Sequence, residues 1–342
     1  MKAAWRWVRT AFSLLMLLAW CWCSANHELV QYLLQQGSGQ LNVLFHTVGL
    51  DEYSRNLEPG SREFDNSCLI DKIKTYSVDS IGYVPGKSYQ TVFVQTESTT
   101  LWVITASKPF ALEPYEWEFP LVGKVSYKGY FDKARATAEY NHLRALGYDV
   151  DMRSVSAWST LGWFNDPLLS SMLSRSRPRF CELLFHELFH ATCYLPSSVD
   201  LNENMASFVA RKATLRFLAA DSGLVKQYMI EEADEKMFND FMFRQCAKLN
   251  QYYRSSERMS HRFEGKLALM KQIADSVAKL PFHNAKPYLA RSTAIMKSKN
   301  AFFVDLRQYD SLQDSLEAVF NKNYNGNLKK LVCDLKQSQI NH

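Results

Sequence analysis

The pattern of apolar and polar positions changes character about halfway along the chain. Before residue 178, short runs rich in β-branched and aromatic residues are interspersed with stretches of helical period. After residue 178, strand patterns almost vanish and helical periods follow one another. The pattern predicts an α+β fold, with a small mixed β-sheet in an N-terminal lobe and a mostly α-helical C-terminal lobe.

In the first half, the pattern predicts helices at 27–46 and 132–146, and strands at 89–95, 101–105, 119–127 and 148–155. The polar stretch 96–100 joins the first two strands into a predicted β-hairpin. Asp132 is a suitable N-cap for the second helix, and Gly147 a suitable stop after it. Helix and strand signals alternate here, as an α+β lobe requires.

In the second half, the predicted helices span residues 178–194, 200–219, 224–250, 257–280, 286–297 and 311–336. Pro178 suits the first turn of a helix, and Pro196 enforces the end of the same helix. Asp200 can cap the helix that follows. The second half is therefore expected to be all-helical.

The first 25 residues have a composition of their own. Basic residues precede an uncharged apolar stretch, Ala11–Trp22, which predicts a secretory signal peptide. This stretch is shorter than the roughly 20 residues that an untilted membrane-spanning helix needs. Cleavage after Ala25 would release a soluble protein, whereas Leu18–Cys21 half-resembles a lipoprotein cleavage box in which Trp20 is out of place. Either outcome predicts a protein of the periplasm or cell envelope, with membrane association through an N-terminal lipid or an uncleaved signal left open.

These patterns divide the chain into a signal peptide (1–25), an α+β lobe with a β-hairpin (26–177) and a helical lobe (178–342). Of the 342 residues, 47% are hydrophobic and 22% charged, which is typical of a packed globular protein. The net charge of +5 is spread along the chain, so nucleic acid is not expected as a partner. Five cysteines follow the signal, an odd number without a CxxC pair, which favours buried thiols over a disulfide scaffold.

The candidate chemistry lies in Cys181–Phe208. His186 and His190 are four residues apart on a predicted helix, so both imidazoles project from one face and can bind one ion. Glu203 follows thirteen residues after His190 and can return from the next helix as a third ligand. Three protein ligands on Zn²⁺ leave a position for water, and Glu187 would act as the general base toward that water. The pattern predicts zinc-dependent hydrolysis, with a peptide as the expected substrate.

A purely structural alternative exists for each of these residues. The two histidines could be core residues, and Glu203 could complete a capping box begun by Asp200. Buried imidazoles and a carboxylate nevertheless need polar partners, which a single cation would supply. Cys193, one turn beyond His190, is expected to pack and not to bind the ion.

The motif HELFH followed by Leu201-Asn-Glu-Asn-Met-Ala206 resembles that of the gluzincin zinc peptidases, in which a glutamate of an NExxA segment completes HExxH. The segments 37–41, 120–132, 147–150 and 159–169 are similar to those of the bacterial family of predicted aminopeptidases, which are often lipoproteins. The resemblance spans roughly residues 30–220 and continues weakly to Tyr309. It implies a zinc metallopeptidase with a zincin-like active-site helix, in which His186, His190 and Glu203 bind the metal and Glu187 is the base.

The chain departs from the gluzincin pattern in three ways. The spacing between the second histidine and the third ligand is short, and Ser207 stands where some gluzincins carry an aspartate that orients a ligand histidine. A Gly-x-Met-Glu-Asn segment, which holds the amino terminus of the substrate in well-known zinc aminopeptidases, is absent. Peptide hydrolysis is therefore better supported than cleavage from the amino end.

We expect two further roles in substrate binding and catalysis. An oxyanion donor is required, and Tyr309 and Tyr130 are chosen from the tyrosines that include Tyr194. The 101–105 strand is expected to be an edge strand that pairs with the substrate backbone. The alternatives to a peptidase are an envelope-associated binding or structural protein with a non-catalytic metal, and an amidase that acts on cell-wall material.

Overall fold

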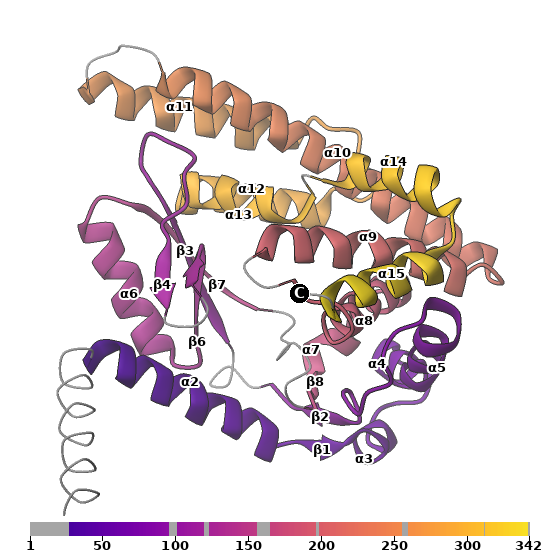
Figure 1. Ribbon diagram of the computed structural model, residues 1–342. Helices are drawn as coiled ribbons and strands as arrows, with labels where there is room; N and C mark the ends of the chain where they lie inside the picture. Colours follow the sequence, from indigo (N-terminus) through magenta and orange to yellow (C-terminus); the bar gives the residue numbers. More distant parts are fainter. Residues whose placement is uncertain are drawn as a thin grey trace, which may run out of the picture. The chain divides into compact units, whose positions relative to one another are not determined.

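The computed structural model describes residues 27–95, 101–119, 123–155, 165–195, 198–254, 259–310 and 312–340. The chain forms two compact units, Met1–His46 and Thr47–His342. In the first unit the described element is helix α2, His27–Phe45, which confirms the predicted helix 27–46 (Figure 1). The signal peptide predicted for residues 1–25 lies outside the described residues. None of the described helices is both long and apolar enough to cross a membrane.

The described residues of the second unit form three small sheets (Figure 1). The first is mixed: β2 (Thr91–Phe93) lies between antiparallel β1 (Val48–Gly49) and parallel β8 (Leu168–Leu169). The second is antiparallel, with β3 (Trp102–Ser107) between β6 (Tyr127–Tyr130) and β7 (Asp149–Ser154). The third pairs β4 (Trp117–Phe119) with β5 (Gly123–Val125). These sheets, together with the helices below, confirm the α+β class.

The predicted hairpin between 89–95 and 101–105 is wrong, because β2 and β3 belong to different sheets. The expectation that 101–105 is an edge strand is wrong for the same reason, since β3 is the central strand of its sheet. Ile104 and Thr105 are 0% and 1% exposed, so the backbone of β3 must find its hydrogen-bond partners within the protein on both sides. Strands distant in sequence supply these partners, and a local turn does not.

The two faces of the β6-β3-β7 sheet have different neighbours. Helix α6 (Lys133–Ala145) begins after the predicted N-cap Asp132, whose Oδ1 accepts a hydrogen bond from the Ala134 N–H at 2.7 Å. Lys128 lies 3.8 Å from Glu139 of α6, so the side chains of Lys128 and Tyr130 share the α6 face. By alternation Tyr127 lies on the opposite face, where Arg153 of β7 pairs with Asp305 of α13 at 2.6 Å.

The remaining elements before residue 177 are short helices: α3 (Leu50–Arg55), α4 (Arg62–Ser67), α5 (Ile70–Tyr76), the π-helix η1 (Ser77–Ile81) and α7 (Ser170–Leu173). From there on, the described elements are α8 (Arg177–His190), α9 (Val199–Phe217), α10 (Ser222–Tyr253), α11 (Met259–Val277), α12 (Lys286–Ser298), α13 (Asn300–Asp310), α14 (Gln313–Tyr324) and α15 (Leu328–Ile340). The mostly helical C-terminal region is thereby confirmed, whereas a boundary between residues 177 and 178 stays a prediction.

Three details of the predicted helices are corrected. The predicted helix 311–336 is two helices, because Asn325 and Gly326 adopt left-handed backbone conformations between α14 and α15. Helix α8 ends at His190, six residues before Pro196, so this proline does not terminate the helix. Ser198 and not Asp200 occupies the N-cap position of α9.

Candidate metal centre

Helices α8 and α9 pack against each other and carry the predicted metal ligands (Figure 1). Pro178 lies in the first turn of α8, and Phe180, Leu184 and Phe185 of this helix are fully buried. These apolar contacts fix the rotation of α8, so that His186 and His190 lie on the side that meets Glu203 of α9.

A reciprocal contact turns the chain back from α8 to α9. The Leu195 N–H donates to Asn202 Oδ1 at 2.8 Å, and Asn202 Nδ2 donates to the Leu195 carbonyl at 2.7 Å. Just before it, the Thr192 hydroxyl donates to the Leu188 carbonyl at the end of α8. Asn202 thus fixes the position of the residue next to it, Glu203. These local bonds explain why α8 ends before Pro196.

The structure brings the three predicted ligands together. His186 Nε2 lies 3.1 Å from His190 Nε2 and 3.2 Å from Glu203 Oε2, and His190 Nε2 lies 3.6 Å from Glu203 Oε1. Zinc at about 2.0–2.1 Å from tetrahedral ligands requires ligand atoms about 3.3 Å apart. The three side chains could therefore hold a metal ion, and zinc fits their spacing and chemistry.

The structural alternatives do not describe this arrangement. Glu203 Oε2 faces His186, and the N-cap position of α9 is Ser198, which makes no side-chain cap, so Glu203 does not complete a capping box with Asp200. Cys193 is buried, and burial raises the pKa of its thiol to about 11. Among the described residues, the candidate metal cluster comprises the two histidines and Glu203 without Cys193.

In each histidine the second ring nitrogen, Nδ1, points away from the cluster of ligand atoms considered above. The surroundings of Nδ1 differ between His186 and His190. The Ser207 hydroxyl lies 3.4 Å from His186 Nδ1 and can orient that ring. His190 Nδ1 is buried and has no hydrogen-bond partner within the described part of the chain. Ser207 follows Glu203 by one helical turn, so the sequence already contained the signal for this contact.

Electrostatics distinguish Glu187 from Glu203. Burial raises the pKa of Glu187, and repulsion from Glu203 and Asp166 adds to this, against the opposing charges of the two histidines. Burial would also raise the pKa of Glu203, but its bonds with His186 and His190 lower it to about 2. Burial lowers the pKa of His186, but the bond with Glu203 and the nearby carboxylates outweigh this and leave it raised. Glu203 is thus suited to bind a cation, and Glu187 to take up and release a proton.

A tyrosine that the sequence did not single out lies near this cluster. The pKa of Tyr127 is raised to about 12 by burial of part of its side chain, and repulsion from Glu203 and Glu187 contributes. Tyr127 is still 38% exposed, so it borders an open space. Only the pairing of β6 shows that Tyr127 faces away from α6, a relation that no local motif encodes.

The two tyrosines predicted from the sequence lie elsewhere or are not fully described. Tyr130 is 5% exposed and lies on the α6 face of the sheet, opposite to that of Tyr127. Tyr309 belongs to α13, but its side chain lies outside what the structure describes. Both stay predictions.

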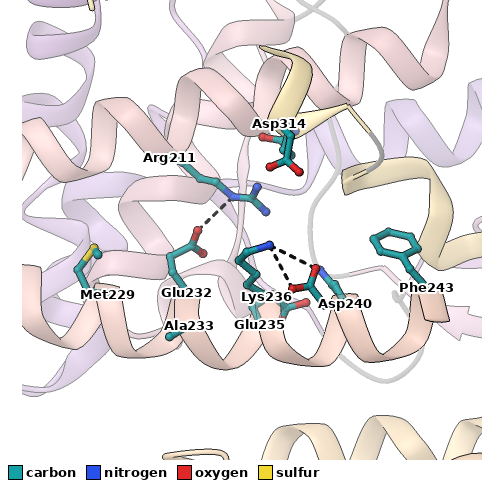
Figure 2. A pocket seen from close by; sticks show the side chains of 11 residues that line it. Arg211, Met229, Glu232, Ala233, Glu235, Lys236, Asp240, Phe243 and Asp314 are labelled. Carbon is teal, nitrogen blue, oxygen red and sulfur yellow. Dashed lines mark hydrogen bonds and ion pairs between the residues drawn. The ribbon is translucent and has the colours of Figure 1, made fainter. Parts of the chain in front are cut away.

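A separate cavity of about 600 Å³ lies between α9, α10 and the start of α14 (Figure 2). It is lined by Arg211, Met229, Glu232, Ala233, Glu235, Lys236, Asn239, Asp240, Phe243, Gln313 and Asp314. Arg211 pairs with Glu232, and Lys236 with Asp240, each at 3.2 Å. The metal-cluster residues do not line this cavity. Its Arg211–Glu232 pair joins α9 to α10, whereas the Lys236–Asp240 pair lies within α10.

Comparison with known proteins identifies a matching family. The model of the family described as "Putative aminopeptidase" matches residues 31–339 of the chain. No curated protein and no solved structure matches the chain.

Proposed function

The chain belongs to the "Putative aminopeptidase" family, and from this premise we propose that it is a zinc-dependent peptidase with Glu187 as the general base. The single observation that carries the proposal is the convergence of His186, His190 and Glu203, with ligand atoms 3.1–3.6 Å apart, beside the buried carboxyl of Glu187. Metal ligands and a proton acceptor at one place are what metal-assisted hydrolysis of an amide requires.

His186, His190 and Glu203 would hold the ion and leave the remaining side of the site to substrate and water. When bound, zinc supplies Lewis acidity, which polarises a carbonyl group and lowers the pKa of water. Glu187, one residue after His186, accepts the proton of the attacking water as the carbon–oxygen bond forms. It then delivers this proton to the amine as the carbon–nitrogen bond breaks.

In this proposal Tyr127 donates a hydrogen bond to the substrate carbonyl oxygen as negative charge develops on it. A phenol is protonated at neutral pH, as a donor must be, and the raised pKa of Tyr127 is consistent with this role. This proposal gives Tyr127 the role that the sequence alone assigned to Tyr130 or Tyr309.

The test is cleavage of a peptide library by the purified protein, read by mass spectrometry with and without a chelator, together with zinc content. Glu187→Gln is expected to retain zinc and lose about 100- to 10,000-fold in turnover, since it removes general-base catalysis. Glu264→Gln, on the exposed side of α11, is the matched control and should leave turnover unchanged. Unchanged turnover in Glu187→Gln would refute the mechanism, and full zinc content without cleavage of any peptide would favour a structural metal.

A further inference from the structure

One side chain from outside α8 holds the turn between the two histidines. Tyr83 is 3% exposed, and its hydroxyl donates to the carbonyl of Phe185, the residue before His186, at 3.1 Å. Its ring makes an edge contact with Phe189, the residue before His190, with ring centroids 6.1 Å apart. Residues four apart share a face of a helix, so Tyr83 spans one turn of α8 beside the face that carries the histidines.

The next residue of the same segment holds the end of α8. The Val84 N–H donates to Thr192 Oγ1 at 3.2 Å, and the Thr192 hydroxyl donates to the Leu188 carbonyl at 3.0 Å. The last carbonyls of a helix lack partners within the helix, and Thr192 supplies one of them. Residues 83 and 84 thus bind α8 at two points, one before His186 and one beyond it.

The backbone before Tyr83 fixes the direction of its side chain. Gly82 follows the π-helix η1 with a φ of 85°, a left-handed conformation that suits glycine. The Tyr83 N–H then donates back to the Ser77 carbonyl at 2.9 Å, which closes the turn. Lys336 of α15 donates to the Gly82 carbonyl at 3.2 Å. The segment is therefore anchored on the side away from α8 as well.

The side chain of Phe185 is fixed independently of Tyr83. Its ring makes edge contacts with Tyr76 of α5 and with Phe217 of α9, at centroid distances of 6.0 and 5.7 Å. These rings hold α8 against the helix that carries Glu203, whereas the hydroxyl of Tyr83 acts on the backbone of α8. Removing this hydroxyl should therefore shift the turn slightly without unfolding the helix.

We propose that Tyr83 is a positioning residue of the metal centre, which acts through Phe185 and Phe189 to set the axial position of the turn that carries His186 and His190. Metal sites tolerate ligand distances only within about 0.2 Å, so a small shift of this turn weakens binding. The inference rests on the proposed function, because the ion that Tyr83 serves is the zinc of that proposal.

The experiment measures the zinc affinity of the full chain by competition with a chromophoric chelator. Tyr83→Phe removes the hydroxyl and keeps the ring beside Phe189. We expect zinc to bind about 10-fold more weakly, at the lower end of the effect of groups that orient metal ligands. With cobalt(II) in place of zinc, the visible absorption, which reports the coordination geometry, should change as well. Thr192→Val, which removes the other contact with this segment, should act in the same direction.

Tyr253→Phe is the matched control. It removes another buried phenol hydroxyl, one that donates to Asn300 Oδ1 of α13 at 2.6 Å. Each tyrosine variant loses one buried hydrogen bond, so both should lower the urea midpoint of unfolding to a similar extent. A role in stability alone would leave the zinc affinity of the folded protein unchanged, and Tyr253→Phe should show this behaviour.

Equal zinc affinity in the wild type, Tyr83→Phe and Thr192→Val would overturn the inference and leave the metal site intact. The same loss of affinity in Tyr253→Phe as in Tyr83→Phe would also overturn it, because reduced stability would then explain the effect. A wild type that binds no zinc would overturn the proposed function itself. Should Tyr83→Phe fail to fold, the comparison of Thr192→Val with Tyr253→Phe decides.

Discussion

His186, a proposed metal ligand, has a hydroxyl beside its second ring nitrogen, at a position where a carboxylate would bind the ring more strongly. Ser207 Oγ lies 3.4 Å from His186 Nδ1, a long contact with a neutral group. Groups that orient metal-binding histidines usually change metal affinity 10- to 100-fold when they are removed. The identity of residue 207 should therefore set how tightly the cluster binds zinc.

Ser207→Ala is expected to weaken zinc binding about 10-fold, and Ser207→Asp to strengthen it, because a carboxylate makes His186 a more basic ligand. Competition with a chromophoric chelator measures both affinities. Ser276→Ala, which removes an exposed hydroxyl on α11, is the control. If all these variants bind zinc equally tightly, Ser207 does not orient His186.

The position of Tyr127 leads to a second prediction at this scale. Tyr127→Phe should keep zinc and substrate binding but lower kcat about 100- to 1,000-fold, as loss of one oxyanion donor does. Tyr130→Phe is the informative comparison, because Tyr130 lies on the other face of the same strand. Single-turnover rates for both variants separate the two tyrosines. A larger loss in Tyr130→Phe would return the role to the residue that the sequence suggested.

At the scale of elements, local signals were reliable where the interaction itself is local. Asp132 caps α6 as predicted, and the spacing of His186 and His190 places both on one face of α8. The prediction of a hairpin was wrong because β3 pairs with β6 and β7. A local sequence pattern does not indicate which distant strands will pair. Tyr127 was missed for the same reason, since the face of the sheet on which it lies follows only from the pairing of β6 with β3.

Asp234 joins α10 to the segment that precedes α12. Its carboxylate accepts hydrogen bonds from the His283 N–H at 2.9 Å and the Asn284 N–H at 2.8 Å. Burial alone would raise the pKa of Asp234, but these backbone bonds and His283 outweigh it and lower the pKa below 3.8. Ionisation of Asp234 is therefore more favourable in the folded protein than in the unfolded chain, and it adds to the free energy of unfolding.

A carboxyl group whose pKa is lower in the folded than in the unfolded protein stabilises the fold. This stabilisation is complete when the pH is above the pKa of the unfolded state, and it is lost as the pH falls through the pKa of the folded state. The free energy of unfolding should decline as pH drops below about 3.8, and Asp234→Asn should flatten that decline. Urea unfolding at several pH values measures the effect, with exposed Asp51→Asn as the control. An equally steep decline in Asp234→Asn would mean that another carboxylate is responsible.

For the molecule as a whole, the sequence predicts a boundary between two lobes at residues 177 and 178, and this boundary lies within the compact unit of residues 47–342. Several contacts cross the predicted boundary between residues 177 and 178. Arg153 of β7 pairs with Asp305 of α13, and Lys266 of α11 is fully buried against Asp149 of β7. Contacts of this kind couple the sheet to the helices, which predicts that both unfold together.

Lys266→Met tests this coupling, because it leaves Asp149 buried without its cation and should cost about 3–5 kcal/mol. The tryptophans beyond the predicted signal, at 102, 117, 158 and 163, all precede residue 178, whereas far-UV ellipticity reports mainly the helices that follow it. If the unit is cooperative, fluorescence and ellipticity share one midpoint, and Lys266→Met lowers both equally. Lys271→Met, on the exposed side of the same helix, is the control. Two separate transitions, of which the variant shifts only one, would instead support the boundary predicted from the sequence.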